Sequence, residues 1–155
     1  MKKVTKLICL VMALVILSTS FVFAAGSKST TVKHKGKQYG EYTGYTKTKK
    51  ATFTGVKKTK RASIKTKVIA KSFKKDGKTY TVNKVVKNAF KGCKKLRKIT
   101  YKGKVALKFA SGAFSGVKTS KITFKCYKKS MSKATFAKIK KNLKKAGFKG
   151  KIVRA

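Results

Sequence analysis

The apolar residues of the segment 82–101 change their spacing partway along the segment. From Val82 to Leu96 they recur every three or four residues, as in a helix, and from Ile99 to Tyr101 they alternate, as in a strand. A switch of period over so short a distance predicts a tight supersecondary unit and not one long element.

A second, degraded copy of this unit follows. The segment 89–93 (A-F-K-G-C) returns 24 residues later as 113–117 (A-F-S-G-V), and 99–101 (I-T-Y) returns 23 residues later as 122–124 (I-T-F). Spacings of roughly 20–29 residues are typical of leucine-rich repeats, in which neighbouring units bury a shared core. We therefore predict an inward-facing set of core residues: Val85, Ala89, Phe90, Cys93, Leu96, Ile99, Phe109, Ala113, Phe114, Val117, Ile122 and Phe124.

The pattern A-F-x-G-C-x-x-L-x-x-I-x-(Y/F), read from Ala89 to Tyr101, resembles the BspA-type leucine-rich repeat of bacterial surface proteins. The resemblance covers about residues 64–152, with a lysine-rich tail similar to the helix that closes some of these arrays. The second copy departs from the pattern, with Val117 for the Cys and Ser120 for the Leu. The resemblance implies a short leucine-rich-repeat solenoid of about two repeats over residues 82–126, with a role in adhesion or protein binding.

A β-rich N-terminal cap is predicted over residues 51–81. The stretch 64–70 is rich in β-branched residues, and Lys75-Asp76-Gly77-Lys78 is a hairpin signal, because Asp-Gly favours a type I′ turn. Such a hairpin would cover the open end of a repeat stack.

A helical cap is predicted over residues 127–155. Ser130 or Ser132 can cap a helix whose apolar face carries Phe136, Ile139, Leu143 and Ala146. Gly147 can end the helix, with Phe148 packing back against it. With the strands of the other segments, this helix makes the expected fold class α+β.

Residues 1–24 read as a bacterial signal peptide. Lysines at positions 2, 3 and 6 precede an unbroken apolar run, Leu7 to Leu17, and the pattern around Ala24, or alternatively Ala25, suits cleavage. The alternative is an uncleaved anchor, since the apolar segment is close to the ~20 residues that span a bilayer. We expect the mature protein to be secreted or held at the cell surface.

Residues 25–50 are polar and basic, and we predict a flexible lead-in there or a first irregular strand. Tyr39, Tyr42 and Tyr45 recur at every third position of this segment. A ladder of aromatic rings for sugars or bases is the functional alternative for these tyrosines.

Acidic residues are almost absent, which argues against an enzyme. The whole chain has Glu41, Asp76 and a single histidine, His34, and Asp76 belongs to the predicted turn. Paired carboxylates would require Glu41 and Asp76 to approach each other, and a Ser-His-Asp triad would have to use His34 in the least ordered part of the chain. An oxygen-ligand metal site needs several carboxylates. We expect no catalytic residues, no metal and no cofactor.

Cys93 and Cys126 remain after removal of the signal peptide, which contains Cys9. Both fall at positions that should face inward, so two free core thiols are favoured over a disulfide, although export would permit one.

The formal net charge of +42 predicts attraction to polyanions. Lysine dominates, and because lysine is a point charge without the bidentate geometry of arginine, base-specific recognition is not expected. The favoured function is an exported scaffold for protein binding and adhesion, held to anionic wall polymers or host surfaces, with a protein ligand as a further partner and no small-molecule substrate. Two alternatives stay open. One is a membrane-active protein acting through the helix over residues 135–149, and the other is a non-specific binder of extracellular nucleic acid.

Overall fold

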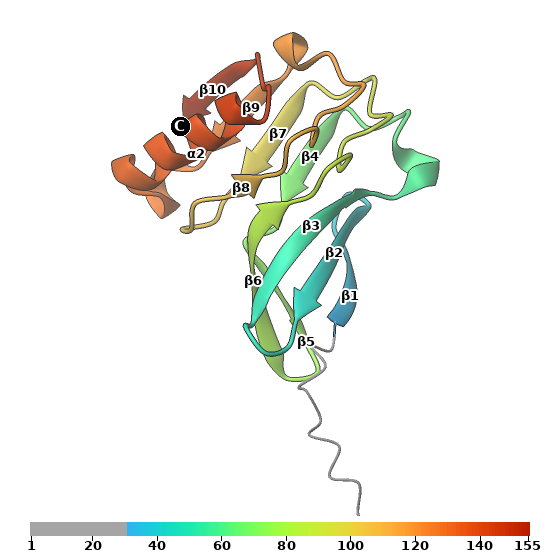
Figure 1. The fold of residues 1–155 in the computed structure, drawn as a ribbon, viewed down its shortest axis with the longest axis vertical. Helices are drawn as coiled ribbons and strands as arrows, with labels where there is room; N and C mark the ends of the chain where they lie inside the picture. Colours follow the sequence, from blue (N-terminus) through green and yellow to red (C-terminus); the bar gives the residue numbers. More distant parts are fainter. Residues whose placement is uncertain (1–30) are drawn as a thin grey trace, which may run out of the picture.

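The computed structural model describes residues 31–155, so the predicted signal peptide and residues 25–30 of the predicted lead-in lie outside the described residues. Within residues 31–155 the chain forms ten strands in two sheets and one α-helix (Figure 1). The predicted combination of helix and strands is therefore confirmed at the level of a mixed α and β fold.

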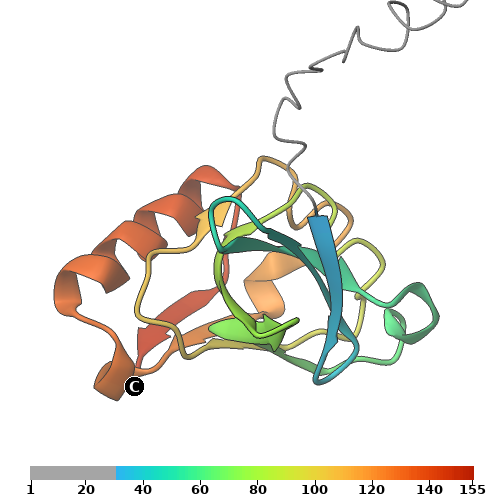
Figure 2. The same ribbon diagram turned by 90° about the horizontal axis from the view of Figure 1, so that it is seen from below.

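The first sheet has the strand order β1-β2-β3-β6-β5, and β8 pairs with β6 beyond this path. Its members are β1 (Thr31–Gly36), β2 (Gly40–Tyr45), β3 (Lys50–Val56), β5 (Ser72–Lys75), β6 (Lys78–Val85) and β8 (Lys108–Phe109). Pairing is antiparallel from β1 to β3 and between β5 and β6, whereas β3–β6 and β6–β8 are parallel. The sheet curls around a common interior, which Figure 2 views from one end, and the Lys75 Nζ donates to the Lys33 carbonyl across the gap between β5 and β1.

The second sheet is entirely parallel, with the order β10-β9-β7-β4. Its strands are β4 (Thr66–Ile69), β7 (Lys98–Tyr101), β9 (Thr123–Cys126) and β10 (Lys151–Arg154). Helix α2 (Lys133–Lys145) lies between β9 and β10 in the chain and packs against β8. Three short 3₁₀ helices, η1 (Lys58–Lys60), η2 (Thr119–Lys121) and η3 (Lys128–Ser130), occupy connections.

The chain passes repeatedly from the first sheet to the second. Strand β3 leads to β4, β6 to β7 after the β5–β6 hairpin, and β8 to β9, and in each sheet these successive strands pair in parallel. The turns between them also meet at equivalent positions, because Asn88 N–H donates to the Gly112 carbonyl at 2.9 Å and Phe90 N–H to the Ala113 carbonyl at 3.2 Å. Residues that are 23 or 24 positions apart in the sequence thus lie beside one another in these turns.

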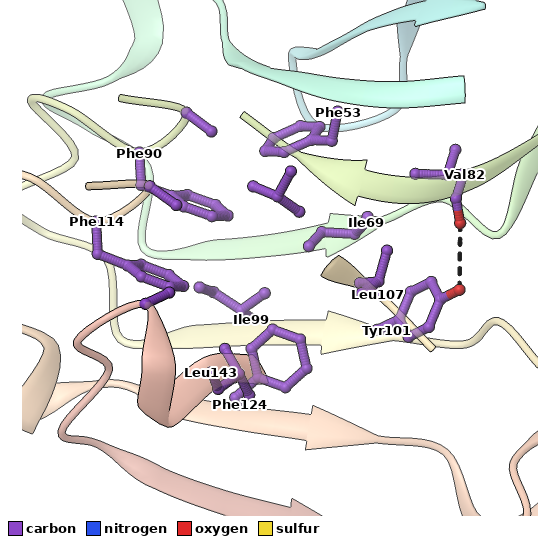
Figure 3. Packing of buried hydrophobic residues seen from close by; sticks show 14 of the residues in the cluster. Phe53, Ile69, Val82, Phe90, Ile99, Tyr101, Leu107, Phe114, Phe124 and Leu143 are labelled. Atoms are coloured by element: carbon purple, nitrogen blue, oxygen red, sulfur yellow. Dashed lines mark hydrogen bonds between the residues drawn. The ribbon is translucent and has the colours of Figure 1, made fainter. Parts of the chain in front are cut away.

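The space between the two sheets holds the aromatic core (Figure 3). Phe90 lies between Phe53 and Phe114, with ring centroids 5.4 and 5.2 Å away. The hydroxyl of Tyr101 donates to the carbonyls of Val82 and Val105 within this core, at 3.3 and 3.0 Å. The predicted core set is buried in the structure except for Phe109 and Val117, which are partly buried and pack against the cluster.

The strand register differs from the sequence alignment by two residues. Ile99 pairs with Phe124 and Tyr101 with Cys126, whereas the repeat alignment had matched segment 99–101 with 122–124. The reason is that η2 lengthens the connection before β9, so that Ile122 ends this turn. A shift of two residues keeps the same side chains facing inward, so the core prediction survives the change of register.

For residues 31–45 the structure departs from a flexible lead-in and is nearer to the predicted alternative of a first strand, because this segment forms two regular strands, β1 and β2. Tyr42 is 2% exposed, and Gly44 leaves space for the rings of Phe73 and Tyr80. These few inward-facing residues, with the backbone pairing to β3, are enough to order a segment that is polar on average.

The predicted β-hairpin is confirmed. Strands β5 and β6 pair in antiparallel register from Lys75 and Lys78 outward. Asp76 and Gly77 have φ angles of 49° and 67°, as the two central residues of a type I′ turn require.

The predicted helix is confirmed at both ends. The Ser132 side chain accepts a hydrogen bond from Thr135 N–H, so Ser132 and not Ser130 is the N-cap. At the other end Gly147 has φ +80° and Phe148 N–H donates to the Leu143 carbonyl at 3.0 Å, which is the Schellman arrangement.

Candidate functional site

The outer face of the second sheet carries lysines and threonines in lateral rows. One row is Thr66, Lys98, Thr123 and Lys151, and the next is Val68, Thr100, Lys125 and Val153. None of these side chains is buried, whereas the inward-facing residues between them are mostly buried. We call the three lysines and three threonines of these rows the lysine–threonine face.

This face is a regular array of positive charges without an acidic residue. Neighbouring strands lie about 4.8 Å apart, so Lys98 and Lys151, two strands apart in one row, are separated by about 10 Å at the backbone. Lysine ammonium groups on flexible side chains make salt-sensitive contacts with anions, but they do not require a particular geometry of the bound anion. The face can therefore hold an extended polyanion without selecting it closely.

A groove of about 780 Å³ lies at the carboxyl ends of the strands of the second sheet. Its walls are the end of β1 with the turn after it (36–38) and the end of β4 with the start of β5 (68–74). Lys102, Tyr127 and Ser130, which follow β7 and β9, complete the lining. We call it the strand-end groove. Because β4, β7 and β9 are neighbours in the parallel sheet, the residues that follow them lie side by side along the groove.

Four hydrogen bonds fix the β1–β2 hairpin to β4 and to the residue after it, and so set the width of the groove. The Lys67 Nζ donates to the carbonyls of Lys37 at 2.8 Å and Gln38 at 3.1 Å. The Gln38 side-chain oxygen accepts from Val68 N–H, and the Tyr42 hydroxyl oxygen accepts from Ala70 N–H at 3.0 Å. The groove is therefore formed before any ligand binds.

Lys67 is fully buried, which is unusual for a lysine. Burial lowers the pKa of its ammonium group to about 8, an effect that the nearby Cys93 thiol partly opposes. Gly40 makes room for the ammonium group, because a Cβ at that position would collide with Lys67 Nζ. Lys67 is a positioning residue for the groove wall and was not singled out from the sequence.

Aromatic rings stand at both ends of the strand-end groove. His34 stacks on Phe73 with ring centroids 4.4 Å apart and planes 4° from parallel. Tyr127, 37% exposed, has the ammonium groups of Lys102 and Lys125 over its ring at 4.7 and 5.8 Å from the centroid. His34 had been placed in the predicted lead-in, and nothing in its sequence context indicated this partner.

The predicted tyrosine ladder is not formed. Tyr42 points into the core, while Tyr39 and Tyr45 are exposed. Tyr39 lies in the turn before β2, and the alternation of β2 puts Tyr42 and Tyr45 on opposite faces, so the three rings cannot form one row.

Cys93 and Cys126 are buried free thiols, as favoured from the sequence. Burial raises the pKa of both, to about 12 for Cys126, which keeps them protonated and unreactive at neutral pH. Across residues 31–155 no group of three or more His, Cys, Asp and Glu side chains lies together as a metal site would require.

The apolar face of α2 is part of the core. Ile139 and Leu143 have no exposed surface, and Phe148 is 4% exposed. This face is therefore covered by the protein and not presented to a lipid surface. Among the described residues no helix is long and apolar enough to cross a membrane.

Comparison with known proteins returns no match to a protein-family model, to a curated protein or to a solved structure.

Proposed function

We propose that this protein is a non-catalytic, exported scaffold of the leucine-rich-repeat kind that attaches to anionic polymers of a cell wall or host surface. The lysine–threonine face is its attachment surface. Adhesion to a protein ligand is a further role that the repeat resemblance suggests.

The repeat part of this proposal is supported by the parallel pairing of β4, β7 and β9 and by the hydrogen bonds between the equivalent turns 88–90 and 112–113. In a leucine-rich repeat each unit contributes one strand to a parallel sheet and contacts only its neighbours. The second unit deviates through η2, in keeping with a short and divergent array.

The attachment part rests on one observation, the regular lysine–threonine face. Lys98, Lys125 and Lys151 come from three adjacent strands and face outward with no carboxylate in their rows. The whole chain has only two acidic residues for 44 basic ones, so most of this charge must find its counterions outside the protein.

Binding to isolated walls or to immobilised poly(glycerol phosphate) tests the proposal. The double variant Lys98→Gln, Lys151→Gln should bind more weakly and be released at lower salt than the unchanged protein. A matched control is Lys138→Gln, Lys145→Gln on the exposed side of α2, which removes the same charge elsewhere. We expect the control to retain most of the binding.

Equal losses in the two double variants would mean that total charge alone governs attachment, and the lysine–threonine face would then have no special role. Absence of binding by the unchanged protein at physiological salt would refute the proposed function as a whole.

Export is tested separately by mass spectrometry of the mature protein. We expect the chain to start at Ala25 or Gly26. An intact Met1 in a membrane fraction would instead make residues 1–24 an anchor, and attachment by lysines would be unnecessary.

A further inference from the structure

We propose that the strand-end groove binds a short stretch of a base-free phosphodiester chain, that is, a sugar- or polyol-phosphate polymer. This inference rests on the proposed function and names the polymer class that the protein would select. It follows from the position of the groove at the strand ends, from its positive charge and from the contacts that its aromatic rings already make.

The groove crosses the ends of several strands of the second sheet. It begins at the β1–β2 turn, passes the ends of β4 and β7, and reaches the residues after β9. At about 4.8 Å per strand, the step from β4 to β9 alone covers about 10 Å. A chain that lies across the strand ends would contact residues from each of these strands in turn.

The charge of the groove is positive along this path. Lys37, Lys71, Lys74 and Lys102 line it, and no acidic residue does. Val68 and Ala70 contribute apolar surface between these lysines. Lysines at the rim and apolar surface between them complement a chain in which phosphates alternate with C–H-rich units.

Much of the aromatic surface in the groove is already in contact with other side chains. Phe73 is 6% exposed and packs nearly parallel to both His34 and Tyr80. Tyr127 lies under two lysine ammonium groups. Binding of single-stranded nucleic acid depends on free aromatic faces, so a chain without bases fits this groove better than DNA or RNA.

Besides its lysines, the groove wall has one amide side chain and two serine hydroxyls. Gln38, the only amide side chain in the groove wall, already accepts a hydrogen bond from Val68 N–H. Ser72 and Ser130 offer hydroxyl groups, which suit the hydroxyls of a sugar or polyol.

The test compares three probes at several salt concentrations: a poly(glycerol phosphate) oligomer, an oligothymidylate with the same number of phosphates, and a polyglutamate of the same charge. Two groove variants are used. Lys71→Gln, Lys74→Gln, Lys102→Gln removes charge from the groove, and Ala70→Phe blocks its floor without changing charge. Thermal melts of each variant confirm folding, and Lys138→Gln, Lys141→Gln, Lys145→Gln on α2 is the matched charge control.

We expect the unchanged protein to bind poly(glycerol phosphate) more tightly than the other two probes. The triple groove variant should lose that preference, and its plot of log affinity against log salt should be shallower by about 2, as expected when three phosphate contacts are lost. Ala70→Phe should also lose the preference, while the α2 control keeps it.

Three outcomes would overturn the inference. Groove variants that bind like the α2 control would show that the groove takes no part, even if Lys98→Gln, Lys151→Gln still weakens attachment and the proposed function stands. A preference for oligothymidylate that depends on the groove would make it a nucleic-acid site. Equal binding of all three probes would leave only unselective charge attraction.

Discussion

Lys67 occupies in β4 the inward position that Ile99 occupies in β7 and Phe124 in β9. Burying an ammonium group is costly unless its hydrogen bonds are met, and here two backbone carbonyls of the β1–β2 turn accept from it. A core position has thus been given to a residue that fastens the N-terminal hairpin to the parallel sheet.

The depressed pKa of Lys67 predicts a rise of stability with pH. In the unfolded chain a lysine has a pKa near 10.5, and in the folded protein that of Lys67 is about 8. Between these values the unfolded state binds more protons, so the free energy of unfolding should increase by about 2 kcal/mol from pH 8 to pH 10 through this group alone. Below pH 8 the group is protonated in both states and adds no further pH dependence.

Urea denaturation under reducing conditions at pH 8 and pH 10 measures this effect. Lys67→Met should lack the added increase, while Lys65→Met, which removes an exposed neighbour, should keep it and so correct for the titration of the other lysines. If Lys67→Met and Lys65→Met show the same change between the two pH values, Lys67 is not held with a lowered pKa.

At the scale of elements, helix α2 is defined by its ends as much as by its apolar face. Its first turn contains no acidic residue, so the Ser132 hydroxyl is the main partner available to the free N–H groups there. Its last turn carries Lys144 and Lys145, whose charges suit the carbonyl end of the helix.

Removal of the N-cap should therefore destabilise the protein. Ser132→Ala should lower the free energy of unfolding by about 1 kcal/mol, the usual cost of a lost serine cap. Ser130→Ala is the matched control two residues earlier, where the hydroxyl donates only to the Tyr127 carbonyl, and it should change stability by much less. If urea denaturation shows a larger loss of stability for Ser130→Ala than for Ser132→Ala, then Ser132 is not the N-cap.

The elements predicted correctly are those whose signals are local. The Asp76-Gly77 turn, helix α2 and most of the buried repeat residues follow from propensity and spacing over a few residues. Strands β1 and β2 were predicted only as the alternative of one irregular strand, because their order depends on β3, on Phe73 and on Tyr80, which lie far along the chain. The strand-end groove was missed for the same reason, since its walls come from four separate segments that only the fold brings together.

At the scale of the whole molecule, the dominant feature is unbalanced charge. The chain carries 44 lysines and arginines against two carboxylates, and folding brings these cations closer together than they are in the unfolded chain. The core compensates with apolar and aromatic contacts, and the lysines are placed almost entirely where water can screen them. The folded state is therefore more sensitive to ionic strength than that of a neutral protein.

Added salt should stabilise this protein, in contrast to proteins held by surface ion pairs. Raising NaCl from 50 to 300 mM shortens the screening length from above to below about 10 Å and weakens lysine–lysine repulsion chiefly in the compact state. We expect the melting temperature at neutral pH to rise by at least about 4 °C, which corresponds to ~1 kcal/mol for a domain of this size. At pH 11, where most lysines are neutral, the same change of salt should have a much smaller effect. A melting temperature that stays flat or falls at neutral pH would mean that repulsion among the lysines does not limit stability. The lysines would then be far enough apart on the surface for their repulsion to be small at low salt.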